Sequence, residues 1–189
     1  MEEKVGKLIV IVAPSGTGKS SLMRRLKEED LLLDESISYT TRPIRPGEID
    51  GKDYFFISQN EFKKMIENDE FIEWFLVHGD YKGTSKKFVE KKVNKGHNLI
   101  FDLDIQGTDA MKKFFPDQAV AIFIKPPSFD VLKQRLEGRG TESEEALSIR
   151  LENAKKELER SDDFDHVVVN DDLDRAYKEL SELVKKLIS

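Results

Sequence analysis

The sequence contains no cysteine, and this absence excludes both a disulfide framework and a metal site built on thiolates. No apolar run approaches the roughly 18 residues that a membrane-spanning helix needs. The opening Met1-Glu2-Glu3-Lys4 does not read as the start of a signal peptide. We therefore expect a cytoplasmic protein that has no membrane partner.

An excess of basic residues is also lacking, because 31 lysines and arginines face 37 aspartates and glutamates. The formal net charge of −6 argues against a general nucleic-acid-binding protein, whose surface would be basic. Internal repeats and low-complexity tracts are absent as well. At 189 residues, the chain is long enough for one core that buries roughly 70% of its unfolded surface.

What the sequence does have is a regular alternation of apolar runs and helical patterns. The apolar runs predict strands at residues 8–12, 37–40, 53–57, 71–77, 98–102, 120–124 and 167–169. Helices are predicted from residue 21, from a capping box at Ser58 and Glu61, and at residues 85–95, 128–136, 143–160 and 173–188. This alternation predicts a three-layer α/β fold with a mainly parallel sheet.

A phosphate-binding loop (P-loop) is predicted between the first strand and the first helix. Its residues are Ala13, Pro14, Ser15, Gly16, Thr17, Gly18, Lys19 and Ser20. The glycines let backbone N–H groups turn inward toward a phosphate, and Lys19 supplies a cation for the β- and γ-phosphates. The Ser20 hydroxyl is the expected Mg²⁺ ligand. Ala13 replaces the usual first glycine of the pattern, and the simpler alternative is an ordinary glycine-rich turn.

Asp102 stands at the carboxyl end of an apolar strand, where open α/β sheets bind their ligands. Beside a P-loop, the favoured interpretation is a Walker-B-like carboxylate that holds Mg²⁺ directly or through water. The alternative is an aspartate that caps a helix just after the strand.

Grouped arginines form the second chemical feature. Arg42 and Arg45 lie three positions apart in a loop stiffened by proline and glycine, so that both can reach one phosphate. Arg135, Arg139 and Arg150 lie in or beside residues 137–150, which we interpret as a mobile arm. Phosphoryl transfer needs positioned cations rather than a covalent catalyst. The alternative for each arginine is a solvated surface charge.

Several longer stretches together resemble guanylate kinases from one end of the chain to the other. They are the P-loop, Ser38-x-x-Thr41-Arg42-x-x-Arg45-x-Gly47-Glu48, Gly51-Lys52-Asp53-Tyr54, Phe71-Ile72-Glu73-Trp74, Asp102-Leu103-Asp104-Ile105-Gln106-Gly107, Arg135-Leu136-x-x-Arg139-Gly140-Thr141-Glu142 and Asn170-Asp171. The second stretch, with the tyrosine that follows it, is much more specific than the P-loop alone.

The resemblance implies one domain made of three parts. Residues 1–37 and 89–189 would form the core with the P-loop for ATP, residues 38–88 an inserted GMP-binding part, and residues 137–150 a helical lid. The expected reaction is Mg²⁺-dependent, direct in-line transfer of the γ-phosphoryl group of ATP to GMP, with dGMP as a second expected acceptor. The rivals are a P-loop kinase for another nucleoside or sugar phosphate, and a catalytically inactive binding module of the same fold.

Residue roles follow from the same resemblance. The GMP phosphate would be held by Ser38, Arg42, Arg45 and Tyr54, and the guanine base would be read by Glu73, Thr84 and Asp104. Arg135, Arg139 and Arg150 would act on the phosphates, with Arg139 and Asn170 near the adenine. Two carboxylates suit the N1–H and N2–H₂ donors of guanine, and the threonine hydroxyl suits its O6. Lys82 stands where the family usually has a second tyrosine, so that its contact with the GMP phosphate is an open hypothesis.

Overall fold

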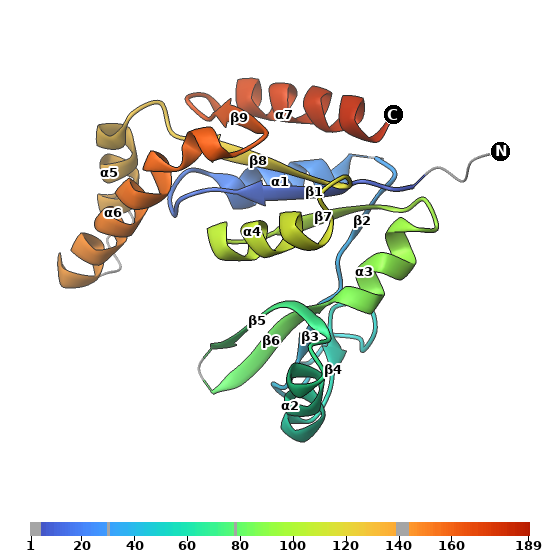
Figure 1. Ribbon diagram of the computed structural model, residues 1–189. Coiled ribbons are helices and arrows are strands. Elements are labelled where there is room, and N and C mark those ends of the chain that lie inside the picture. Colours follow the sequence, from blue (N-terminus) through green and yellow to red (C-terminus); the bar gives the residue numbers. More distant parts are fainter. Residues whose placement is uncertain (1–4, 30, 78, 139–143) are drawn as a thin grey trace.

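The computed structural model describes residues 5–29, 31–77, 79–138 and 144–189. These residues form two sheets, one of five strands and one of four, which lie one above the other in Figure 1. No helix within these ranges is both long enough and apolar enough to cross a membrane.

The larger sheet has the strand order β2-β7-β1-β8-β9, and all its pairs are parallel. Its strands are β1 (Leu8–Val12), β2 (Leu33–Glu35), β7 (Asn98–Asp102), β8 (Ala119–Lys125) and β9 (His166–Val169). Every residue of β1 is buried, as expected for a parallel strand with helices on both of its faces.

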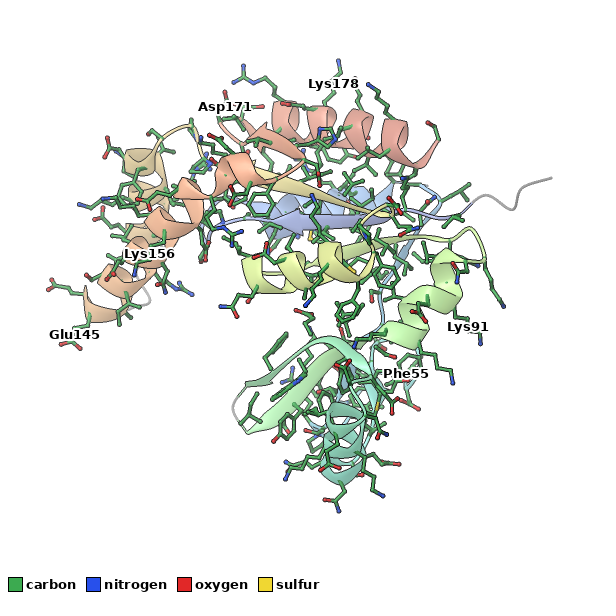
Figure 2. The ribbon with its side chains drawn as sticks, in the orientation of Figure 1. Phe55, Lys91, Glu145, Lys156, Asp171 and Lys178 are labelled. Atoms are coloured by element: carbon green, nitrogen blue, oxygen red, sulfur yellow. The ribbon has the colours of Figure 1, made fainter. Side chains whose placement is uncertain are left out.

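Helices cover both faces of this sheet. Leu8 and Val10 pack with residues of α3 (Lys86–Val93) and α4 (Ile105–Phe114). Ile9 and Ile11 point the other way and pack with α1 (Lys19–Glu28) and α7 (Leu173–Ile188). On the outer face of α7, Lys178 points away from the sheet (Figure 2). The predicted three-layer α/β fold with a mainly parallel sheet is therefore confirmed.

The smaller sheet has the order β4-β3-β6-β5 and an aromatic core of its own. Its elements are β3 (Tyr39–Thr40), β4 (Phe55–Phe56), β5 (Phe71–Val77), β6 (Asp80–Ser85) and the covering helix α2 (Gln59–Glu67). The helix begins at the predicted capping box of Ser58 and Glu61. Its fully buried Phe62 stacks on Phe71 and Tyr81, at ring-centroid distances of 4.4 and 5.2 Å.

Two helices, α3 and α4, connect the sheets. The first contacts β6 and β7, and the second contacts β5 of the smaller sheet as well as β1 and β8 of the larger one. A separate helical layer consists of α5 (Phe129–Glu137) and α6 (Glu144–Glu159), followed by a short 3-10 turn at Ser161–Asp163. Leu132, Leu136 and Ala154 form the core between α5 and α6. Glu145 marks the outer end of α6 in Figure 2.

The sequence interpretation did not include three elements, namely β2, β6 and α4. The strand β2 reads Leu-Asp-Glu and β6 reads Asp-Tyr-Lys-Gly-Thr-Ser, so neither shows an apolar run. The helix α4 contains Gly107, which weakens a helical pattern. Two predicted strands are shorter in the structure, where residues 37–40 reduce to Tyr39–Thr40 and residues 53–57 reduce to Phe55–Phe56.

Candidate active site

The P-loop conformation depends on two glycines. Gly16 and Gly18 have φ angles of 88° and 90°, a left-handed region that glycine adopts without strain. Gly18 is also the N-cap of α1, so the loop leads directly into the positive end of a helix dipole. A cavity is lined by residues 13–21 and by Asp102. The backbone therefore forms the kind of concave surface that holds phosphate oxygens.

Buried hydrogen bonds fix the loop from behind. The Thr17 hydroxyl donates to the carbonyl of Pro14 over 2.8 Å. The amide of Asn170, only 4% exposed, donates to the carbonyl of Thr17 over 2.6 Å. The carbonyl of Asn170 in turn accepts from Nη2 of Arg135 at 3.1 Å. The structure thus places Asn170 against the loop backbone, where it supports the turn.

Lys19 and Asp102 meet at the carboxyl edge of the sheet. Asp102 is opposite Ile11 in the parallel register of β1 and β7, so its carboxylate emerges beside the start of the P-loop. The ammonium of Lys19 forms an ion pair with it. Half of the Asp102 side chain remains exposed. The helix that follows β7 is capped by Asp104 rather than by Asp102, which leaves the Asp102 carboxylate facing the cavity.

A second cavity lies between the two sheets, and it collects most of the residues that sequence reasoning assigned to GMP. Its lining includes Ser38, Tyr54, Glu73, Lys82, Thr84, Asp102 and Asp104. Asp102 lines both this cavity and the P-loop cavity. The two predicted substrate sites are therefore neighbours that share one carboxylate.

At one end of this cavity, Glu73 and Thr84 face each other across β5 and β6. The Thr84 hydroxyl donates to Oε1 of Glu73 over 3.1 Å. Burial raises the pKa of Glu73, the neighbouring Asp104 carboxylate acts in the same direction, and the Thr84 hydrogen bond opposes both. Asp104 caps α4 through Oδ1, which accepts from the N–H of Gly107 at 2.7 Å. Two carboxylates thus converge on one polar wall of the cavity.

At the opposite end, a third cavity gathers the positive charge. Arg42, Arg45, Tyr54 and Lys82 line it, and Tyr54 and Lys82 also line the second cavity. Nη1 of Arg42 donates to Glu48 over 2.7 Å, and the backbone N–H of Arg45 donates to the same carboxylate over 2.9 Å. The Arg42 hydrogen bond lowers the pKa of Glu48 to about 2. One ionised glutamate therefore holds the loop that carries both arginines.

Lys82 faces this cavity. It lies on β6 opposite Thr40 and Phe75, and its Nζ is 5.4 Å from the centre of the Tyr54 ring. The guanidinium of Arg42 is 5.1 Å from the centre of the same ring. Two cations thus lie close to the Tyr54 ring, an arrangement suited to an anion.

The remaining predicted arginines lie in the helical layer. Arg135 is on α5 and Arg150 is on α6, while Arg139 is outside the described residues. Neither Arg135 nor Arg150 is among the residues that line the cavity around the P-loop.

Sequence reasoning missed several residues of the cavity walls. Phe75 lines both the second and the third cavity, and Met23, Lys27 and Ser36 line the second. Phe75 could have been found from strand periodicity, because it lies two positions after Glu73 and so points to the same face. The Ser36 hydroxyl is buried and has no hydrogen-bond partner within the described part of the chain. No motif marks it.

Comparison with known proteins gives a consistent result. A family model described as guanylate kinase matches residues 5–187. The chain belongs to the guanylate kinase family. Guanylate kinases are phosphotransferases that use ATP to phosphorylate GMP, and the chain is a kinase of this type.

Individual relatives support the assignment over nearly the whole chain. The guanylate kinase of Caldanaerobacter subterraneus subsp. tengcongensis is 46% identical over 182 residues, which cover 96% of this chain and 88% of that protein. That of Thermotoga maritima is 46% identical over 181 residues, covering 95% and 86%. The crystal structure of guanylate kinase from Anaplasma phagocytophilum has a TM-score of 0.69 at 31% identity and covers 97% of this chain and 86% of that one. The resemblance noted from the motifs is thereby confirmed.

Proposed function

We propose that this chain transfers the γ-phosphoryl group of ATP directly to the phosphate of GMP, in line and with Mg²⁺. The observation that carries the proposal is that Asp102 lines both the P-loop cavity and the cavity with the guanine-reading residues. A donor phosphate on the loop and an acceptor phosphate between the sheets would meet at this carboxylate. Direct transfer needs this proximity and no covalent intermediate.

On the ATP side, the backbone of residues 13–18 would hold the β-phosphate, and Lys19 would balance the charge on the moving phosphoryl group. The Lys19–Asp102 ion pair keeps the ammonium at the mouth of the loop. Asn170 would stand near the adenine while it supports the loop from behind.

Mg²⁺ fits the oxygen atoms that this edge of the sheet presents. Mg²⁺ typically binds one or two carboxylates and completes its shell with water and substrate phosphates. The Ser20 hydroxyl and the Asp102 carboxylate line the same cavity and are both exposed. No cluster of three or more His, Asp or Glu side chains suited to a metal occurs among the described residues, so phosphate oxygens would supply the other ligands. When bound, the ion would neutralise charge on the β- and γ-phosphates.

On the GMP side, the four-residue group of Arg42, Arg45, Tyr54 and Lys82 would hold the phosphate, assisted by Ser38. Glu73 and Asp104 would accept from the N–H groups of guanine, and the Thr84 hydroxyl, which donates to Glu73 in the structure, would turn to donate to O6. Adenine would present a lone pair to Glu73 at N1, which leaves a buried carboxylate unpaired at a loss of about 1–3 kcal/mol. None of these groups is assigned to the ribose, so dGMP is a second proposed acceptor.

In the proposed function, each sheet belongs to a different substrate-binding part of the chain. Residues 38–88 would form the GMP-binding part, residues 1–37 and 89–189 the core, and residues 137–150 a lid with Arg135, Arg139 and Arg150 acting on the phosphates. If so, amide hydrogen exchange in α6 should slow when ATP and GMP are added together. Equal exchange with and without nucleotides would contradict a lid.

Direct chromatographic measurement of ADP formation tests the proposal. ATP would be supplied with GMP, dGMP, AMP, UMP or CMP in parallel, each with Mg²⁺ and with EDTA. We expect rapid ADP formation with GMP and dGMP and none in EDTA. Equal rates with another nucleotide would favour the rival kinase interpretation, and no turnover with any acceptor would favour the inactive binding module.

With no membrane-spanning helix in the described ranges, the proposed location is the cytoplasm, where ATP and GMP are available.

A further inference from the structure

Gly107 is in contact with both of the carboxylates assigned to guanine. It is the third residue of α4, whose N-cap is Asp104. Its N–H donates to Oδ1 of Asp104 over 2.7 Å. On its other side, a Cβ atom added to Gly107 would lie 2.2 Å from Oε2 of Glu73 and 3.3 Å from Oδ1 of Asp104. The bare Cα therefore forms one wall of the space that the Glu73 carboxylate occupies.

The backbone conformation gives no reason for a glycine here. The φ angle of Gly107 is outside the left-handed region, unlike those of Gly16 and Gly18. At helical positions such as this one in the first turn of α4, alanine is favoured over glycine because glycine loses more conformational freedom on folding. Glycine therefore makes the helix less stable at this position than alanine would, but it leaves space for the Glu73 carboxylate.

The atom that a methyl group would displace is the end of a flexible side chain. Oε1 of Glu73 is hydrogen-bonded to Thr84, while Oε2 lies against Gly107. The fold can absorb a methyl group because the carboxylate can rotate away. A hydrogen bond weakens steeply as its distance and angle depart from the optimum. The same rotation of the Glu73 carboxylate would therefore weaken its hydrogen bonds to guanine.

We infer that Gly107 determines specificity for guanine, because its bare Cα fixes where Glu73 presents its carboxylate beside that of Asp104. Gly107 acts through these two side chains and is a positioning residue. The inference rests on the proposed function, in which Glu73 and Asp104 accept from the base. The GMP phosphate would be held by a different set of residues, so a change at Gly107 should leave the contacts to the phosphate unaffected.

The variant Gly107→Ala tests this inference in the full chain. We expect KM for GMP to rise roughly tenfold or more, as when a hydrogen bond to a charged group is lost, and discrimination against AMP to fall. KM for ATP and kcat at saturating GMP should stay within about twofold, because Gly107 does not line the P-loop cavity. The melting temperature should hold or rise, since alanine favours the helix. Lys113→Ala, an exposed substitution at the other end of α4, is the control and should alter none of these values.

A second substitution separates displacement of Glu73 from general damage to α4. Glu73→Asp withdraws the carboxylate by one methylene, about 1.5 Å, and so removes the group that the new methyl would strike. Gly107→Ala should then add little to the effect of Glu73→Asp on KM for GMP. Multiplying effects in the double variant would overturn the inference, because they would mean that Gly107 acts independently of Glu73.

The controls also separate this inference from the proposed function. If Glu73→Gln weakens GMP but Gly107→Ala does not, the positioning role is wrong and the guanine site stands. If both variants leave the GMP and AMP kinetics unchanged, the inference is overturned together with the assignment of the guanine site. A lowered melting temperature together with a raised KM for ATP in Gly107→Ala would also overturn the inference, because it would indicate structural damage.

Discussion

The P-loop and the wall formed by Glu73, Thr84 and Asp104 differ in what holds them. The P-loop follows a strand whose five residues are all buried, and its shape is maintained by backbone torsions and by the buried amide of Asn170. Glu73, Thr84 and Asp104, which we propose read guanine, come from β5, β6 and the N-cap of α4, and Trp74, Phe75 and Leu76 of the same β5 are 46, 39 and 56% exposed. One site is made of backbone in a rigid core, and the other of side chains at the junction of two sheets.

This difference predicts how substitutions should divide between the two kinetic constants. In the proposed function, backbone donors and Lys19 would meet charge that develops during transfer, so damage there should appear mainly in kcat. Side chains that would contact the guanine base meet a group that does not react, so damage there should appear mainly in KM for GMP. The predictions below test this division in order of decreasing expected effect.

The largest effect is expected from Lys19→Ala. Removing the cation that pairs with Asp102 and faces the P-loop cavity should lower kcat roughly a hundredfold or more, with the fold intact. Steady-state kinetics would measure kcat, and circular dichroism would show whether the fold is intact. Near-normal turnover would remove the P-loop from the mechanism.

Glu73→Gln changes the proposed guanine site and should act mainly on KM for GMP. It replaces an acceptor-only carboxylate with an amide that can also donate, so GMP should bind more weakly by about 1–3 kcal/mol. Rejection of AMP should relax, and kcat should change much less than in Lys19→Ala. A loss of kcat equal to that of Lys19→Ala would break the proposed division between the sites.

The protonation of Glu73 should make GMP binding dependent on pH. Burial raises the pKa of Glu73, and the charged form is the acceptor that guanine needs. As pH falls through this raised pKa, KM for GMP should therefore increase, and it should do so at higher pH than for an exposed glutamate. Glu73→Gln provides the control, because the GMP phosphate titrates equally in both proteins. Identical pH profiles would count against an ionised Glu73 at the base.

The smallest effect is expected at Lys82. In the proposed function, its ammonium beside Tyr54 would attract the GMP phosphate by a charge that salt screens over about 8–10 Å. KM for GMP should therefore rise with ionic strength, and Lys82→Tyr should flatten that rise without a large change in kcat. Arg42 and Arg45 should supply part of the salt dependence, so the wild type and the variant must be compared. Parallel salt curves would show that Lys82 does not contact the phosphate.

Sequence reasoning reached the residues of the P-loop because their geometry is encoded locally. Gly16, Gly18 and Lys19 lie within four consecutive positions, and an apolar strand and a helical pattern flank them. The assignment of Glu73, Thr84 and Asp104 to one site came from family resemblance, and the structure brings these residues to one cavity. Periodicity alone could not have done so, because β6 is too polar to be read as a strand.

By itself, the sequence determined the α/β alternation, the glycine-rich turn between β1 and α1, and the family, because each is carried by contiguous residues. Tertiary structure alone decided which distant groups touch. The amide of Asn170 reaches the loop across 153 positions of sequence, and the Cα of Gly107 meets the carboxylate of Glu73 only because α4 packs against β5. Such contacts depend on how two sheets and the helices between them pack, and the spacing of residues along the chain does not encode that packing.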